Sequence, residues 1–222
     1  FTINDVSVDP VITSAIVNNS NCSGAPNFNG SITAIVDGFA PAAGQFSLTW
    51  FIGSGTGGAA LPAGNIAGAN NEVAQLLSAG TYTVRVVDTS SPNNTCEQIA
   101  TFTVADDLPV ITIASADIIL TDQTNCTANG SAQVVDITED GTPLGGVGGY
   151  TFTWLQGNGA AIAGSGSAAT VGAALGAGNY LVSARNTTSN CVSTATSFTI
   201  NDVSVDPVIT SAIVNNSNCS GA

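Results

Sequence analysis

Apolar and polar residues alternate in several short stretches of the chain, with the period of two that is typical of β-strands. Phe46, Leu48 and Trp50 alternate with serine and threonine, and the same pattern occurs in 82–86 and 150–154. In a strand with this pattern, one face packs against a core and the other faces water. We therefore expect sheets that are each buried on one side.

Clusters of Gly, Asn, Pro and Asp separate short strand candidates along the chain. In the first half these candidates are Ile12–Val17, Ser31–Val36, Gln45–Ile52, Val73–Leu77, Thr81–Val87 and Ala100–Val104. The Ala-rich segments 53–70 and 156–178 carry many glycines, each of which costs a helix about 1 kcal/mol, so we expect loops with a strand inside. The pattern predicts an all-β fold of immunoglobulin-like β-sandwich domains.

The chain repeats itself at two levels. Residues 1–25 and 198–222 are identical, which gives a period of 197 residues. The motif PVIT begins at 10, 109 and 207 and divides that period into two related units. The chain opens on Phe and contains no Met, so we expect an interior piece of a longer tandem array. The expected divisions are the last strand of a preceding repeat plus a linker at 1–9, one domain at 10–108, a second at 109–206, and the first part of the next repeat at 207–222.

The five cysteines follow the repeat. Cys22 and Cys96 lie in the first unit, Cys126 and Cys191 in the second, and Cys219 lies in the duplicated end at the position of Cys22. Each tryptophan follows the first cysteine of its unit by 28 residues, which supports pairing within units. We predict disulfides between Cys22 and Cys96 and between Cys126 and Cys191, each contributing about 4 kcal/mol, with Cys219 paired outside the chain. Such bridges imply an oxidising compartment.

The charge distribution excludes several classes of partner. The chain has 15 acidic and 2 basic side chains, and its net charge is −13. Nucleic acid is not an expected partner, because its phosphates need clustered Lys and Arg. No apolar run approaches the length of a spanning helix, so we expect no membrane insertion of this region. Arg85 and Arg185 lie on matching strand candidates, where we expect ion pairs on the surface of a sheet.

The residues needed for the common catalytic arrangements are missing. The sequence has no His and no Lys, which rules out Ser-His-Asp, Cys-His and Ser-Lys arrangements. Paired carboxylates occur at Asp106 and Asp107 and at Glu139 and Asp140, but neighbours in sequence rarely converge on one substrate. A zinc site is not expected either, since there is no CxxC motif. We expect that the protein is not an enzyme.

Calcium is the one cofactor for which the sequence offers ligands. Acidic residues gather at the boundaries between units, where carboxylates of two domains could share a hard cation. The candidates are Asp5, Asp9, Asp106, Asp107, Asp202 and Asp206. The alternative is that the acidic linkers stay solvated and keep neighbouring domains apart. We favour this alternative, and expect no bound metal, because the DxDxDG spacing is absent.

The order of motifs resembles a known family of repeats. Each unit has a Cys in an Asn- and Gly-rich turn (NCSGAPNFNGSITAIV, NCTANGSAQVV), then an aromatic strand (FSLTWF, YTFTWL), then AGTYTVRVVD or AGNYLVSARN, and then a closing Cys (NNTC, SNC). This order resembles the repeat of the gliding-motility adhesin SprB and related giant surface proteins of Bacteroidetes. Asn186, in place of an Asp, and the long stretch 53–71 depart from the pattern. The resemblance implies a filamentous cell-surface adhesin exported by the type IX system, with the repeats as its stalk.

We expect a structural stalk repeat of an extracellular, cell-surface adhesin that projects a binding tip from the cell. Its expected partners are neighbouring repeats of the same protein, and surface glycans or other cells. One alternative is a filament or sheath subunit that polymerises through edge strands. Another is a glycan-binding module whose long loops, such as 53–71, recognise the sugar.

Overall fold

The computed structural model describes residues 9–41, 44–90 and 96–215. It is all-β, with several antiparallel sheets and two short 3-10 helices in the described part of the chain, as the sequence predicts. Residues 12–104, here called the first unit, and residues 111–200, the second unit, have separate hydrophobic cores. None of the described helices is long and apolar enough to cross a membrane.

The first unit consists of two sheets that enclose one core. One sheet has the order β1-β2-β5-β4 and the other β3-β6-β7. Their bounds are β1 Ile12–Val17, β2 Gly30–Val36, β3 Phe46–Ile52, β4 Ile66–Ala67, β5 Val73–Leu77, β6 Gly80–Asp88 and β7 Glu97–Val104, with the 3-10 helix η1 at Ala63–Asn65. Ile32 of β2, Ala74 of β5, Trp50 of β3 and Val84 of β6 are fully buried in the shared core. The apolar residues of the alternating pattern thus face the core.

The second unit has three sheets around its core, and several of its strands are shorter than those of the first unit. Its sheets have the orders β10-β9, β12-β11-β8 and β13-β14-β15. The bounds are β8 Ile111–Thr112, β9 Ile118–Thr121, β10 Ser131–Val134, β11 Thr138–Glu139, β12 Thr142–Pro143, β13 Tyr150–Gln156, β14 Gly178–Asn186 and β15 Thr196–Ile200, with the 3-10 helix η2 at Ser115–Asp117. Trp154, Val134 and Val182 lie at the centre of its core.

A tyrosine fixes the start of the long central strand in each unit. The Tyr82 hydroxyl donates a hydrogen bond to the Ser78 carbonyl at 3.0 Å, and the Tyr180 hydroxyl donates to the Gly176 carbonyl at 2.8 Å. Each bond reaches back four residues across the corner that precedes the strand, as in the tyrosine corner of immunoglobulin-like sandwiches. The two corners correspond, as expected for copies of one unit.

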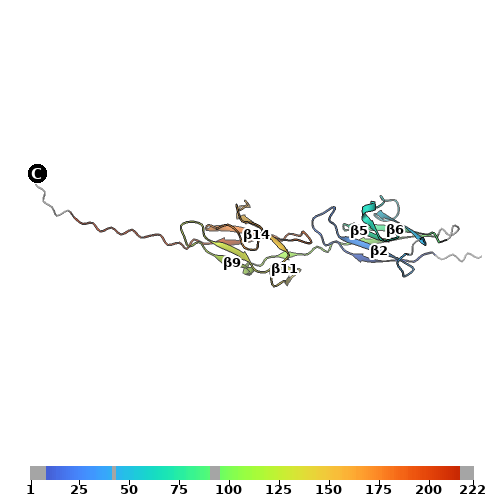
Figure 1. Cartoon of the computed structure of the whole chain (residues 1–222), viewed down its shortest axis with the longest axis horizontal. Coiled ribbons are helices and arrows are strands. Elements are labelled where there is room, and N and C mark those ends of the chain that lie inside the picture. Colours follow the sequence, from blue (N-terminus) through green and yellow to red (C-terminus); the bar gives the residue numbers. More distant parts are fainter. Residues whose placement is uncertain (1–8, 42–43, 91–95, 216–222) are drawn as a thin grey trace, which may run out of the picture.

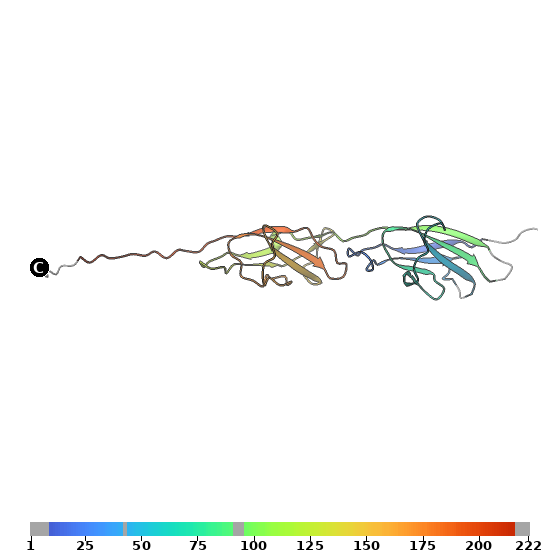
Figure 2. The ribbon, with the colours of Figure 1, turned by 90° about the horizontal axis from the view of Figure 1, so that it is seen from above.

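The two units lie end to end, and the described end of the chain continues away from the second unit (Figures 1 and 2). Residues 207–215 have the same sequence as 10–18, which contain β1. In the first unit this segment pairs with β2, whereas 207–215 belong to no strand. Val208, Ile209, Ile213 and Val214 of this segment are 87–92% exposed. The final described segment is thus a copy of β1 without its sheet.

The strands predicted for the first unit occur within three residues of their expected ends. The segment 53–70 contains η1 and β4, which confirms a loop with a strand inside. In 157–177 the structure has only isolated bridges, such as Gly130 to Leu175, so the strand expected there is not formed. Residues 42–43 and 91–95 and the expected elements at 1–8 and 216–222 lie outside the described residues.

Candidate functional site at the junction of two units

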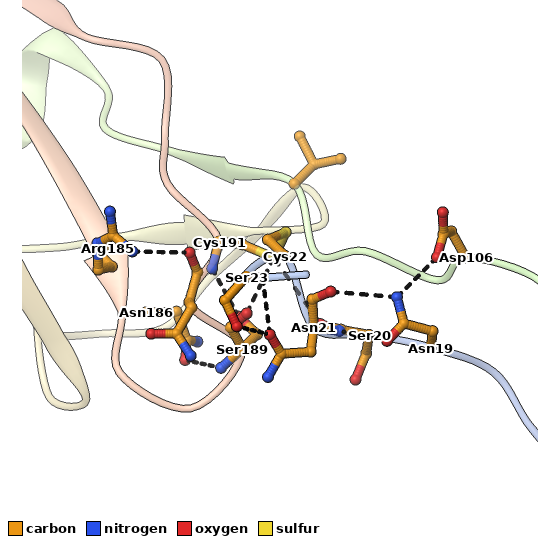
Figure 3. Close-up of a disulfide and its surroundings, with 12 residues drawn as sticks. Asn19, Ser20, Asn21, Cys22, Ser23, Asp106, Arg185, Asn186, Ser189 and Cys191 are labelled. Carbon is orange, nitrogen blue, oxygen red and sulfur yellow. Dashed lines mark hydrogen bonds between the residues drawn. A yellow bond between two sulfur atoms is a disulfide. The ribbon is translucent and has the colours of Figure 1, made fainter. Parts of the chain in front are cut away.

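A disulfide between Cys22 and Cys191 joins the first unit to the second (Figure 3). Cys22 follows β1 in the first unit, and Cys191 lies between β14 and β15 in the second. The two residues are 169 positions apart in sequence, and their Cα atoms are 4.9 Å apart. Cys191 is 2% exposed. The bridge therefore links two folds that each have their own core, instead of stabilising either core from within.

Hydrogen bonds to backbone carbonyls lie beside the disulfide. The Cys22 amide donates to the Ser189 carbonyl at 2.8 Å, and the Asn21 side-chain amide donates to the Thr188 carbonyl at 3.5 Å. Both bonds cross from the first unit to the second. The two turns thus meet in a defined geometry in which the sulfur atoms are brought together.

Asn19 attaches the cysteine turn to the strand that leads into the junction. Its backbone amide donates to the Ala105 carbonyl at 2.9 Å, and its carbonyl accepts from the Asp107 amide at 2.7 Å. Its side-chain amide donates to the Asp106 carboxylate at 2.8 Å (Figure 3). Asn19 is 2% exposed, so this buried side chain fixes the position of the turn.

The pairing predicted from the sequence, Cys22 with Cys96 and Cys126 with Cys191, is wrong. Asn19 forms a parallel β-bridge with Asp106, which places the turn of Cys22 beside the C-terminal end of β7. Cys96, by contrast, immediately precedes the start of β7. The eight residues of β7 span about 26 Å at ~3.3 Å per residue. Cys22 and Cys96 therefore lie at opposite ends of the first unit. They cannot form a disulfide, because that bond needs Cα atoms within roughly 7 Å of each other. Cys219 lies outside the described residues.

Strand direction is the signal that the sequence interpretation missed. In an end-to-end array, the first and last strands of a unit both run from its N-terminal to its C-terminal end. The opening cysteine comes after the first strand, and the closing cysteine comes before the last strand. An opening cysteine therefore faces the next unit and a closing cysteine faces the preceding one, which favours pairing between units.

A polar cleft lies beside this junction. Its volume is about 290 Å³, and it is lined from both units, by Ser20, Asp107, Pro109, Glu139, Asp140, Asn186, Thr188 and Ser189. Glu139 accepts hydrogen bonds from the Tyr150 hydroxyl and, at 3.1 Å, from the Asn186 side-chain amide. Burial and the hydrogen bond to Glu139 raise the pKa of Tyr150 above its ordinary value. The hydroxyl therefore stays protonated at neutral pH and binds Glu139.

The calcium candidates do not gather into a cluster. No group of three or more His, Cys, Asp or Glu residues that could hold a metal occurs in 9–41, 44–90 and 96–215. The Asp106 carboxylate accepts from Asn19, and the Asp202 carboxylate accepts from the Ser204 amide at 2.9 Å. Hydrogen bonds from Ser204 lower the pKa of Asp202. Asp9, Asp107 and Asp206 are exposed, and Asp5 lies outside the described residues.

The basic residues lie on sheet surfaces. Arg85 Nη2 and Glu97 Oε2 form an ion pair at 2.6 Å, which confirms the expectation for Arg85. The hydrogen bond to Arg85 lowers the pKa of Glu97, and the same bond raises the pKa of Arg85. Arg185 Nη1 instead donates to the Asn190 carbonyl at 3.5 Å, in the turn that carries Cys191. The expected ion pair is thus replaced at Arg185 by a backbone contact.

A second hollow, on the first unit, has a largely apolar lining. Its volume is about 420 Å³, and residues of the opening loop, η1 and β5 line it, among them Pro26, Phe28, Leu61 and Leu76. Both tryptophans are at most 1% exposed and donate their indole N–H groups to backbone carbonyls. The hollow therefore lacks an exposed tryptophan on which a sugar ring could stack.

Among known proteins, solved structures align with this chain. No family model and no curated protein matches it. Extracellular cadherin domains 3-6 of protocadherin gamma B2 align over 89% of this chain and 50% of theirs, with 11% identity and a TM-score of 0.24. The EC3-6 cis-dimer structure of protocadherin gammaB7 aligns over the same shares, with 13% identity and a TM-score of 0.20. The chain spans about half the length of both structures, and these TM-scores are too low to establish a shared fold.

Proposed function

We propose that the chain is a structural segment of a long extracellular surface filament, a tandem array of immunoglobulin-like units that holds a binding region away from the cell. The Cys22–Cys191 disulfide is the observation that carries this proposal. A bond between two independently cored units keeps them in line, and this matters most for a protein whose function depends on length and stiffness. The bridge also fits an oxidising location outside the cell.

The repeated ends support the array. Residues 207–215 carry the sequence of β1 and its flanks, and their apolar side chains are exposed in the absence of a sheet. Another copy of β2 would pair with this segment in the register in which β1 pairs with β2, and in the first unit the equivalent Val11, Ile16 and Val17 are only 42–61% exposed. The order of motifs that resembles the SprB repeat supports the same role as an adhesin stalk. No enzyme activity is part of this proposal.

The same exposed segment favours a second candidate, a filament of separate chains. In that case residues 207–215 of one chain would complete the first sheet of another chain, by strand addition. Both candidates place a second copy beyond the second unit. They differ in whether a peptide bond or only an exchanged strand connects consecutive copies.

The mass of the protein on its native cells separates the two candidates. After reduction and denaturation, the array predicts one chain many times longer than 222 residues, and antibodies to the repeat should decorate fibres on the cell surface in electron micrographs. A reduced chain with only a few units, combined with fibres, would favour the polymer. A short chain without fibres at the surface would contradict both.

A further inference from the structure

Two cysteines in the described part of the chain are unpaired, and they lie at opposite outer ends of the molecule. Cys126 is exposed in the turn after β9, at the far end of the second unit. Cys96 is half-buried and directly precedes β7, at the outer end of the first unit. Neither can reach the other within one chain, because both units lie between them.

The turn that carries Cys126 is built like the turn that carries Cys22. Thr124 and Asn129 make the same pair of hydrogen bonds as Ser20 and Asn29: the Thr124 amide donates to Asn129 Oδ1 at 2.9 Å, and Asn129 Nδ2 donates to the Thr124 hydroxyl at 2.8 Å. Gln123 takes the place of Asn19, with parallel bridging to Asp202. Cys126 is therefore held in the position from which Cys22 bonds to the following unit.

Cys96 and the described residues 88 and 89 are held by the same hydrogen bonds as Cys191 and its neighbours. The Asp88 amide donates to the Cys96 carbonyl at 2.9 Å, as the Asn186 amide donates to the Cys191 carbonyl at 3.0 Å. The next residue, Thr89, donates its amide to the Gln45 carbonyl at 2.7 Å, as Thr187 donates to the Gly149 carbonyl at 2.9 Å. Cys96 therefore occupies the position from which Cys191 bonds to the preceding unit.

We propose that Cys126 of one copy of this repeat forms a disulfide with Cys96 of the next copy, so that every junction along the array is bridged. The partner is a second copy of this sequence. Residues 207–215 repeat the start of the first unit, and they follow the second unit at the end where Cys126 lies. This inference rests on the proposed function, since it requires consecutive copies. The two thiols lose two protons and two electrons, which a disulfide such as oxidised glutathione accepts as it is reduced to two thiols.

The loop lengths fit such a bond. The linker after the second unit has five residue steps from Asp202 to Pro207, against three from Asp106 to Pro109. This difference moves the next copy away by up to about 7 Å at ~3.3 Å per residue. The sequence before the closing cysteine is longer by a similar number of residues: Cys96 lies eight positions after Asp88, whereas Cys191 lies five after Asn186. The two sequence differences at this junction thus match in direction and size.

The test uses the 222-residue chain with Cys219→Ser as the parent, which removes the duplicated opening cysteine. Two variants on this parent, Cys96→Ser and Cys126→Ser, each keep one of the proposed partners. The variants are incubated singly and mixed in a glutathione redox buffer, and free thiols are then blocked. Non-reducing electrophoresis detects linked chains.

The proposed bond predicts a ladder of oligomers for the parent, monomers for each variant alone, and a dimer for the mixture. If one variant alone formed as much dimer as the mixture, the proposal would be overturned, because exposed thiols would then pair unselectively. Absence of a dimer in the mixture would also overturn it.

Native protein provides a second measurement. Trypsin cleaves after Arg85 and Arg185, so Cys96 and Cys126 share the fragment 86–185. The proposal predicts that this fragment is linked by a disulfide to another copy of itself. An unlinked fragment in which both Cys96 and Cys126 carry the thiol-blocking reagent would overturn the proposal. A giant native chain in which these two thiols are free would support the array and contradict the Cys126–Cys96 disulfide. Failure of this inference can therefore be distinguished from failure of the proposed function.

Discussion

Cys22 and Cys191 form a bond across the boundary between two units that fold around separate cores. The bond closes a covalent loop that contains nearly all of both units. Tension applied to the two ends of the chain would therefore pass through the sulfur atoms and bypass the residues between them. This mechanical consequence can be measured directly.

Pulling the chain from its two ends should reveal the length protected by the bridge. With the disulfide intact, the 169 positions between Cys22 and Cys191 cannot extend. Reduction should release about 570 Å of additional chain, at ~3.4 Å per residue. Single-molecule force spectroscopy with and without a reductant measures this difference. Cys22→Ser is the control, which should extend fully with and without the reductant. If the parent chain extended equally in both conditions, the disulfide would not protect the residues between Cys22 and Cys191.

Gly130 should be intolerant of a side chain. A Cβ at this position would lie 2.7 Å from the Ile200 Cγ2 atom and 2.9 Å from the Leu175 carbonyl oxygen. Gly130→Ala should therefore lower the free energy of unfolding of the second unit by about 1–3 kcal/mol. Gly146→Ala is the matched control, because a Cβ there meets nothing within 4 Å. Urea denaturation followed by Trp154 fluorescence in a Trp50→Phe background reports the second unit, and similar values for both variants would refute the close contact.

The Tyr180 corner should stabilise the second unit specifically. Tyr180→Phe removes the hydrogen bond to the Gly176 carbonyl while keeping the ring, and should cost about 0.5–1.5 kcal/mol. Tyr82→Phe removes the equivalent bond to Ser78 in the first unit. In the Trp50→Phe background, only the Tyr180 variant should shift the unfolding midpoint that Trp154 fluorescence reports. A shift of equal size from Tyr82→Phe would show that the two units unfold together.

Stability of the second unit should fall in alkaline solution. The pKa of Tyr150 is raised in the folded state by burial and by the hydrogen bond to Glu139. The folded chain therefore holds this proton more tightly than the unfolded chain, so the stabilisation is complete below pH ~10 and is lost as pH rises through the raised pKa. Urea midpoints measured across this range should fall less steeply in Tyr150→Phe than in the parent. Identical slopes would exclude Tyr150 as a source of this pH dependence.

Much of the fold could be predicted from the sequence, because the period of two and the glycine-rich turns are local signals. β1 and β5 have the predicted bounds, and both tryptophans are buried as their patterned strands require. The loop 157–177 gave no comparable signal, since its small residues suit many backbone conformations.

The disulfide could not be predicted by assigning each pair of cysteines to its own unit. The error came from treating sequence spacing as proximity, while strand β7 holds Cys96 and Cys22 at opposite ends of the first unit. The cleft beside the junction was also missed, because it combines Ser20 and Asp107 with Glu139 and Asn186 from the second unit. Contacts between units depend on how the folded units are placed, which local patterns do not describe.

A tryptic map of the unreduced 222-residue chain tests most directly whether the disulfide joins consecutive units. Cleavage after Arg85 and Arg185 places Cys22 in fragment 1–85 and Cys191 in fragment 186–222. With Cys219→Ser and blocked thiols, mass spectrometry should find these two fragments linked and fragment 86–185 separate from both. Linkage of 86–185 to either of the other fragments would show pairing within units and would contradict the bridge on which the stalk proposal depends.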